Sequence, residues 1–171
     1  MKTEIEREFI RCGRRHIWMF SDEQIALRPR EYYGDVSRLG HATSMIFDIM
    51  DVVTQKAVGE IALRIGESDG LFYLGHIGYH INSPFRGKHG ALRACRLCIP
   101  IFKQLGMRSF VITTDVDNRA SIRTCQSLGC VLESTVMVPL WCRREFAITD
   151  KKLRYIYEIP EKEHCVSKGN E

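Results

Sequence analysis

The chain has 171 residues, of which 44% are hydrophobic, and its 25 basic and 21 acidic residues give a formal net charge of +4. This even balance excludes a dedicated nucleic-acid binder, while the apolar content suffices for one cored domain over residues 1–171, with a frayed tail over residues 161–171. The charges in the first eight residues argue against a signal peptide, and the sequence contains no run of about 18 apolar residues that could span a membrane. We therefore expect a cytoplasmic protein without nucleic-acid or membrane partners.

The first half of the chain predicts β structure. Residues 25–29 are expected to form a short strand, and residues 30–43 a polar connection with weak helical character. Recurring β-branched residues around the turn Thr54-Gln55-Lys56 predict a hairpin of residues 44–53 and 57–65.

A longer strand is expected over residues 71–82, and it contains Gly75 and Gly78. Glycine inside a strand marks a bulge or a close approach of another group to the backbone. We therefore expect close packing against this strand.

The second half alternates helices and strands. Residues 90–105 carry an apolar stripe at helical spacing, with Pro100 predicting a kink or an early break and Gly106 a C-terminal stop. Asp117 or Asn118 is expected to cap a second helix over residues 119–128. The remaining expected strands cover residues 109–114, 131–138 and 153–159.

A basic, glycine-containing turn precedes the first of these helices. It reads Arg86-Gly87-Lys88-His89-Gly90-Ala91 and follows an apolar strand that ends near Ile81. Unpaired backbone N–H groups and the helix dipole favour a phosphate at such a helix N-terminus. The turn therefore predicts a phosphorylated cofactor.

The order of this turn, a long helix, a strand, Asn118-x-x-Ser121 and Leu128-Gly129-Cys130 resembles the GNAT superfamily of acetyl-CoA-dependent N-acetyltransferases. It is most similar to the bacterial branch that acetylates ribosomal-protein N-termini and small amines. The resemblance implies an α+β fold with a mixed, mostly antiparallel central sheet of six to seven strands, flanked by helices and splayed at the fourth and fifth strands.

The resemblance also implies acetyl-CoA as co-substrate, with its pyrophosphate on amides of the basic turn and its thioester carbonyl held by an amide between Gly78 and Ile81. His89 stands where the family has its inner glycine. We expect a right-handed turn there, which does not require glycine. The cofactor-binding residues that follow are Tyr79, Ile81, Arg86, Gly87, Lys88, His89, Gly90, Ala91, Asn118 and Ser121.

Acetyl transfer to an amine requires a route for protons. An amine with a pKa near 10.4 is mostly protonated at neutral pH, and freeing its lone pair costs about 4 kcal/mol. His76 and His80, on one face of the expected strand, are candidate bases because histidine titrates near neutrality. Asp115 and Asp117 are alternatives, although helix capping is the stronger interpretation for Asp117.

The leaving thiolate needs a proton donor, which in the resembling family is commonly a tyrosine on the helix after the Asn-x-x-Ser positions. Residues 118–130 contain no tyrosine, and Cys125 occupies that place. A thiol is closer in pKa to a coenzyme thiol than a phenol is, so Cys125 is the candidate donor. The alternative is a small, buried core cysteine.

Two further expectations concern metals and function. Cys95-x-x-Cys98 lies in an apolar helical stripe and lacks a second ligand pair, so we expect core residues and no metal. The acceptor is expected to be a primary amine of a small molecule or a peptide. The sequence is compatible with a homodimer. The alternative function is a non-catalytic acetyl-CoA sensor or scaffold, which the missing tyrosine favours. An RNA-associated role rests only on mild basicity.

Overall fold

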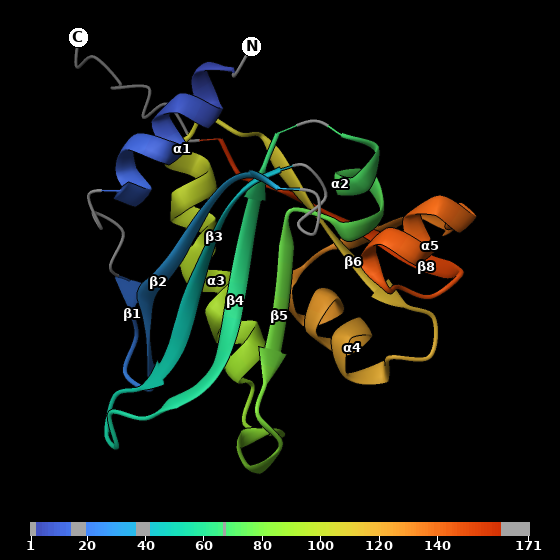
Figure 1. Cartoon of the computed structure of the whole chain (residues 1–171). Helices are drawn as coiled ribbons and strands as arrows, with labels where there is room; N and C mark the ends of the chain where they lie inside the picture. Colours follow the sequence, from blue (N-terminus) through green and yellow to red (C-terminus); the bar gives the residue numbers. More distant parts are fainter. Residues whose placement is uncertain (1–2, 15–19, 37–41, 67, 162–171) are drawn as a thin grey trace, which may run out of the picture.

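The computed structural model describes residues 3–14, 20–36, 42–66 and 68–161. These residues form one eight-stranded sheet with helices on both sides (Figure 1). The expected tail beyond residue 161 lies outside the described residues. The strands are β1 (Phe20–Ser21), β2 (Ile25–Val36), β3 (Ala42–Asp51), β4 (Ala57–Ile65), β5 (Ile77–Ile81), β6 (Ser109–Asp115), β7 (Val131–Met137) and β8 (Lys151–Glu158).

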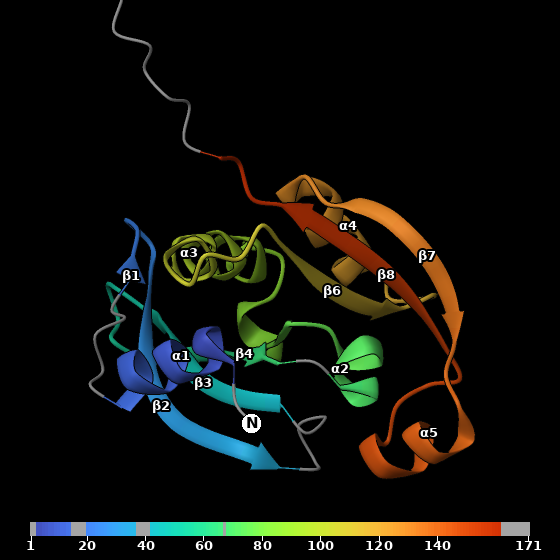
Figure 2. The same ribbon diagram turned by 90° about the horizontal axis from the view of Figure 1, so that it is seen from above.

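The helices are α1 (Glu4–Arg14), α2 (Asp69–Leu74), α3 (Gly90–Gln104), α4 (Arg119–Leu128) and α5 (Leu140–Phe146), with a 3₁₀ turn, η2, over Ser83–Phe85. Figure 2 shows α3 and α4 on one side of the sheet and α2 and α5 on the other. α1 shares the side of α3, and its Phe9 and Cys12 are buried in the same core. None of the described helices has both the length and the apolar character needed to cross a membrane.

The strand order is β1-β2-β3-β4-β5-β6-β8-β7, and every neighbouring pair is antiparallel except β5 and β6. Those two strands run parallel and share a single register pair, Ile77 with Ile112, before they diverge (Figure 1). The predicted mixed, mostly antiparallel sheet with a splay is thus confirmed. The two-residue strand β1 brings the number of strands to eight.

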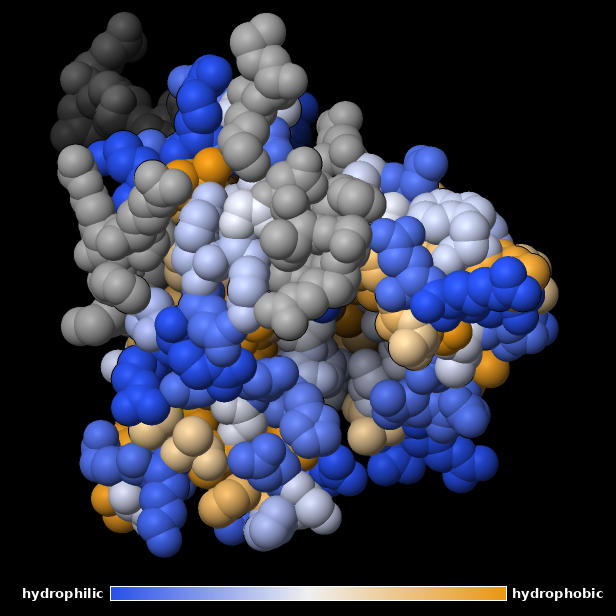
Figure 3. All heavy atoms as spheres, viewed as in Figure 1, coloured by the Kyte–Doolittle hydropathy of each residue, from blue (hydrophilic) through white to orange (hydrophobic). Residues whose placement is uncertain are grey.

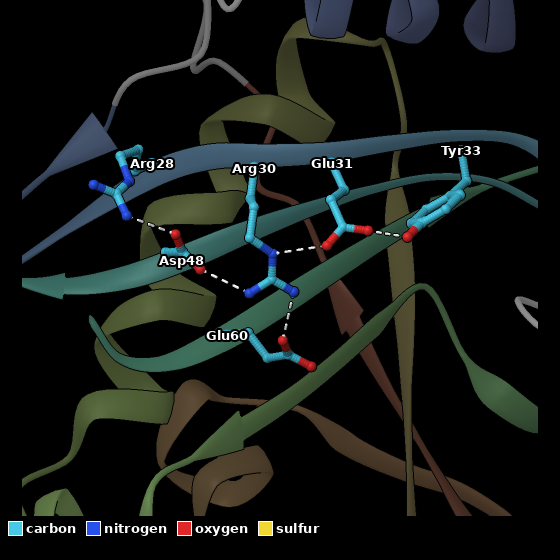
Figure 4. A network of polar contacts seen from close by, with 6 residues as sticks. All are labelled: Arg28, Arg30, Glu31, Tyr33, Asp48 and Glu60. Carbon is cyan, nitrogen blue, oxygen red and sulfur yellow. Dashed lines mark hydrogen bonds and ion pairs between the residues drawn. The ribbon is translucent and has the colours of Figure 1, made fainter.

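The two faces of the sheet differ in chemistry. Side chains that point toward α3 are apolar and buried, among them Phe47 and Ile61. On the opposite face Arg30 bonds Asp48 at 2.8 Å and Glu60 at 2.7 Å, while Arg28 bonds Asp48 at 2.9 Å (Figure 4). Hydrophilic residues gather over β2 to β4 in the space-filling view (Figure 3). The alternation of strand residues therefore turns one face toward the core and one toward water.

Several predicted elements are confirmed. The hairpin is β3 and β4, the long helix is α3, which continues through Pro100 to Gln104, and the capped helix is α4 with the predicted bounds. Local signals suffice for these elements because apolar periodicity and caps act within a few residues.

The expected polar connection over residues 30–43 is wrong, because β2 continues to Val36. Its pairing with β3 shifts register between Pro29 and Glu31 and again between Tyr33 and Val36. Each bulge breaks the alternation by which a strand is recognised in the sequence, and Pro29 also suggests a strand end.

The expected strand over residues 71–82 is also wrong in its first half, where α2 forms instead. Ser68 caps α2 by accepting a hydrogen bond from the backbone N–H of Leu71 at 3.0 Å, and Gly75 ends it at φ 72°. The short helices α1 and α5 were not predicted, although Thr3 and Glu6 form a reciprocal capping box that marks the start of α1.

The close approach predicted at Gly75 is confirmed, because a Cβ there would lie 2.8 Å from the Val111 carbonyl oxygen and 3.0 Å from the Thr113 nitrogen. Its φ of 72° and ψ of 170° lie in a region that only glycine adopts readily. Gly106 has a similar φ of 75°, but a Cβ at that position would have no atom within 4 Å.

We predict that Gly75→Ala lowers the free energy of unfolding by about 3 kcal/mol, since strain and collision add. Gly106→Ala, which meets only the cost of a positive φ, should lower it by about 1 kcal/mol. Urea denaturation of both variants measures the difference. Equal losses would show that β6 does not press against Gly75.

Candidate functional site

Two cavities meet where β5 and β6 diverge. The larger, of about 620 Å³, lies between the end of β5, the turn before α3, and α4; we name it the loop cavity. The smaller, of about 180 Å³, lies between β4, β5, β6 and β8; we name it the splay cavity. Tyr79, Asn118 and Ser121 line both. The two cavities therefore adjoin at these three residues.

The turn before α3 forms one wall of the loop cavity. Arg86 bonds the Ile81 carbonyl oxygen through Nε at 2.9 Å, which ties the turn back to β5. Of the predicted cofactor-binding residues in the turn, Arg86, Gly87, His89, Gly90 and Ala91 line the cavity, whereas exposed Lys88 does not. The predicted residues Tyr79, Ile81, Asn118 and Ser121 also line it.

His89 is the N-cap of α3 and has φ 58° and ψ 19°. Our expectation of a right-handed turn is wrong at this residue, because it adopts the left-handed conformation that glycine adopts most easily. The His89 side chain makes no capping hydrogen bond to the helix. The first amides of α3 therefore face the loop cavity without a side-chain acceptor, as an anion site requires.

A pair of hydroxyl groups stands where the cavities meet. Tyr79 Oη lies 2.8 Å from Ser121 Oγ, although the two residues come from β5 and α4. The Asn118 Oδ1 atom accepts the Ser121 backbone N–H at 3.1 Å and so fixes the start of α4. Burial raises the pKa of Tyr79, so its phenol stays protonated at neutral pH.

The splay cavity is polar and charged. Asp115 pairs with Lys152 Nζ at 2.5 Å and accepts a hydrogen bond from Thr149 Oγ1 at 2.5 Å. Burial alone would raise the pKa of Asp115, but these bonds outweigh it and leave the pKa below its usual value. Arg64, from β4, lines the same cavity, and burial lowers its pKa to about 10, so it remains a cation at neutral pH.

The two histidines proposed as bases lie in different surroundings. His80 is exposed and lines the loop cavity, whereas His76 lines neither cavity. His76 Nδ1 accepts the Val111 backbone N–H at 3.0 Å, and the His76 backbone N–H donates to the Val111 carbonyl at 2.8 Å. This geometry gives His76 a structural role in joining β5 to β6.

The two aspartates considered as alternative bases, Asp115 and Asp117, also differ in their surroundings. Asp115 lines the splay cavity, and Asp117 is exposed and lines neither cavity. Of the two residues expected to cap α4, the one whose side chain does so is Asn118, and the interpretation of Asp117 as the cap is wrong.

The three cysteines considered as site residues, Cys95, Cys98 and Cys125, are buried. Cys125 is 0% exposed and lines neither cavity, and its hydrogen bond with Cys130, together with burial, raises its pKa. Cys95 and Cys98 lie in the hydrophobic core as predicted. Among the described residues, no group of three or more His, Cys, Asp or Glu side chains is arranged to hold a metal ion.

Arg64 and Lys152 were not predicted as site residues. Arg64 falls on a polar position of a strand with alternating burial, and Lys152 lies near the start of β8 beside exposed Lys151, and solvated surface residues occupy such places too. No sequence signal separates the two cases, because burial of these side chains depends on where β4 and β8 lie relative to β5 and β6.

Comparison with known proteins gives a family and a fold. Residues 11–131 match the family model described as the acetyltransferase (GNAT) domain. The ribosomal-protein-S5-alanine acetyltransferase from Vibrio fischeri superposes with a TM-score of 0.60 at 15% identity, covering 84% of this chain and 97% of that one. A GNAT-family acetyltransferase from Bacillus anthracis gives 0.63 at 14% identity, covering 84% and 99%.

The microcin C7 self-immunity acetyltransferase MccE, solved in complex with acetyl-CoA and AMP, gives a TM-score of 0.53 at 24% identity and covers 68% of this chain and 61% of that one. No curated protein matches the chain. At these identities the solved structures establish a shared fold.

The half-buried His76 predicts a pH dependence of stability. Burial, followed by the charges of Arg154 and Arg64, lowers its pKa to about 4 in the folded state, against about 6.5 when unfolded. As the pH falls below about 6.5, the unfolded chain binds a proton that the folded chain does not, so stability is lost between about pH 6.5 and pH 4. The loss from this group should approach 3 kcal/mol.

His76→Asn keeps an acceptor for the Val111 N–H but does not titrate, so its stability should fall less over the same pH range. Urea denaturation of both proteins at about pH 7 and about pH 4.5 measures this difference. Parallel losses would mean that His76 is accessible to protons in the folded state.

Proposed function

The chain belongs to the GNAT acetyltransferase family, and we propose that it is an N-acetyltransferase that moves the acetyl group of acetyl-CoA to a primary amine by direct attack on the thioester. The observation that carries this proposal is the meeting of two cavities at the Tyr79–Ser121 hydroxyl pair. One cavity suits a phosphorylated cofactor and the other an acceptor, so the reacting atoms would meet between them. Proximity of this kind lowers the entropic part of the barrier.

The loop cavity fits acetyl-CoA. The uncapped N-terminal amides of α3 and the glycine-containing turn offer donors to a pyrophosphate, and Arg86 holds the turn in place. The related fold of MccE was solved with acetyl-CoA, which supports the same co-substrate here. Acetyl-CoA supplies an activated acyl group whose carbonyl develops negative charge, and backbone amides of β5 would stabilise that charge.

We propose Tyr79 as the group that protonates the departing thiolate. Its hydroxyl lies at the junction of the cavities, stays protonated because burial raises its pKa, and is oriented by Ser121. Cys125, the donor expected from the sequence, is sealed in the core. A phenol from β5 thus stands beside α4, and the missing tyrosine on α4 no longer favours a non-catalytic sensor.

The acceptor would enter through the splay cavity. Of the candidate bases, Asp115 lines that cavity, and its pairing with Lys152 makes it a weak one. His80 lines the loop cavity instead. The ribosomal-protein-S5-alanine acetyltransferase shares the fold, which supports a peptide N-terminal amine as one acceptor class beside small amines.

The first prediction concerns acetyl-CoA binding. Ala91→Val places a branched side chain beside the first amides of α3 and should weaken CoA binding by about tenfold or more. Lys88→Ala, a matched change in the same turn whose exposed side chain does not line the cavity, should weaken it less than about threefold. Isothermal titration calorimetry with CoA measures both. If Lys88→Ala weakened binding more than Ala91→Val, the side-chain charge of Lys88 rather than the backbone amides would hold the pyrophosphate.

The second prediction concerns the proton donor. Tyr79→Phe should lower kcat by about 10²-fold while CoA binding stays within a factor of about three, because the lost bond forms chiefly in the transition state. Cys125→Ala should keep near-normal kcat and lose some stability, as removal of a buried thiol from a core predicts. Release of free thiol from acetyl-CoA with a panel of amines and peptide N-termini is the measurement.

If Cys125→Ala were the slow variant and Tyr79→Phe the normal one, the thiol would be the donor. If wild type released no thiol with any amine but bound CoA, the chain would be a binding module.

A further inference from the structure

Arg64 is a half-buried cation for which the described residues provide no anionic partner. Other arginines of the described chain pair with carboxylates: Arg28, Arg30, Arg93 and Arg154. Within the described part of the chain, the hydrogen bonds of Arg64 are two long contacts from Nη1, to the carbonyl oxygens of Leu74 at 3.5 Å and Gly75 at 3.3 Å. Its Nε is sealed from solvent and has no hydrogen-bond partner among the described residues. A guanidinium has five N–H donors, and leaving them unpaired in a buried position is costly.

The backbone of β5 makes room for this cation. A Cβ at Gly78 would lie 2.8 Å from Arg64 Nη2 and 3.0 Å from Nη1, so a side chain at this position would displace the guanidinium from its place against the strand. Gly78 precedes Tyr79, and both line the splay cavity with Arg64. The cation is therefore held against the wall of the splay cavity.

The other charges of the splay cavity cancel. Asp115 and Lys152 are paired with each other at 2.5 Å, which leaves Arg64 as the uncompensated charge among the described residues that line the cavity. The cavity is about 180 Å³ in volume and so suits a compact group. A positive, narrow site of this kind attracts an anion and repels polyamines.

We propose that Arg64 binds a carboxylate of the acceptor, so that the enzyme acetylates amines that carry a carboxylate a few atoms from the reacting nitrogen. This inference rests on the proposed acetyl transfer through the splay cavity. A planar guanidinium matches a carboxylate with two parallel N–H···O bonds, and such a pair would also orient the amine toward the thioester. The carboxylate could be the α-carboxylate of a free amino acid or the side chain of an acidic first residue of a peptide.

Paired acceptors distinguish these two sources. Alanine against alaninamide tests the α-carboxylate, and tripeptide amides that begin with Asp against those that begin with Asn test the side chain. In at least one pair the wild-type enzyme should prefer the acid by about tenfold or more in kcat/KM, expressed mainly in KM. Equal or better use of the amide in both pairs would overturn the proposal.

Variants of Arg64 test whether this residue is the origin of the preference. Arg64→Gln should reduce the ratio of kcat/KM for the acid to kcat/KM for the amide to about one. Arg64→Lys should retain part of this preference, because an ammonium keeps the positive charge but cannot donate two parallel hydrogen bonds to a carboxylate. The control is Arg96→Gln, an exposed arginine on α3 that lines neither cavity, which should leave the ratio unchanged. An acid preference that persists in Arg64→Gln would place recognition elsewhere.

A binding measurement separates this inference from the proposed activity. N-acetylalanine and the α-amide of N-acetylaspartate mimic the two products, and calorimetry in the presence of CoA should show that one of them binds at least about tenfold more tightly than its carboxamide counterpart. Arg64→Gln should abolish the difference. If no amine were acetylated, the proposed activity would fail while this selective binding still supported the anion site. If neither acid bound selectively, the anion site would fail whatever the activity.

Discussion

The structure depends on the parallel contact between β5 and β6, which is limited to one register pair, Ile77 with Ile112. His76 closes the contact with two hydrogen bonds to Val111, and Gly75 lets the backbones approach because it has no side chain to collide with β6. Beyond this point the strands diverge, so their backbone groups turn toward two cavities instead of each other. A longer pairing would close the junction at which acetyl donor and acceptor are proposed to meet.

Charged side chains have partners of opposite charge on the outer face of β2 to β4, whereas Arg64 beside the splay has none among the described residues. On the outer face of β2 to β4, Arg28 and Arg30 share Asp48, so the charge of that buried carboxylate is compensated by two guanidinium groups (Figure 4). Beside the splay, Arg64 is half-buried, its Nε is sealed from solvent, and no carboxylate of the described residues pairs with it, which costs stability. Proteins commonly retain such unfavourable groups where function needs them, and a preorganised cation that awaits an acceptor carboxylate is consistent with that pattern.

The hydroxyl proposed as proton donor, that of Tyr79, comes from β5 and not from α4, where the family resemblance places it. The family resemblance led to α4, where Cys125 occupies the expected place, but that thiol is turned into the core. Tyr79 reaches the same region from β5, 42 residues before Ser121 in the chain, and bonds Ser121 of α4. The position of a hydroxyl in space, rather than its place along the chain, decides whether it can donate a proton.

The sequence by itself determined the elements whose signals are local: the β3–β4 hairpin, α3, and α4 with its Gly129 end. It also located the turn from Arg86 to Ala91, because glycine content and a following amphipathic helix are read from neighbouring residues. It missed α2 and the length of β2, where bulges and a short helix disguise the periodicity. Only the tertiary structure decided that Tyr79 meets Ser121 and that Arg64 lies beside Gly78. These contacts join residues of different elements, and whether a polar side chain faces water or a cavity is set by the packing of neighbouring strands.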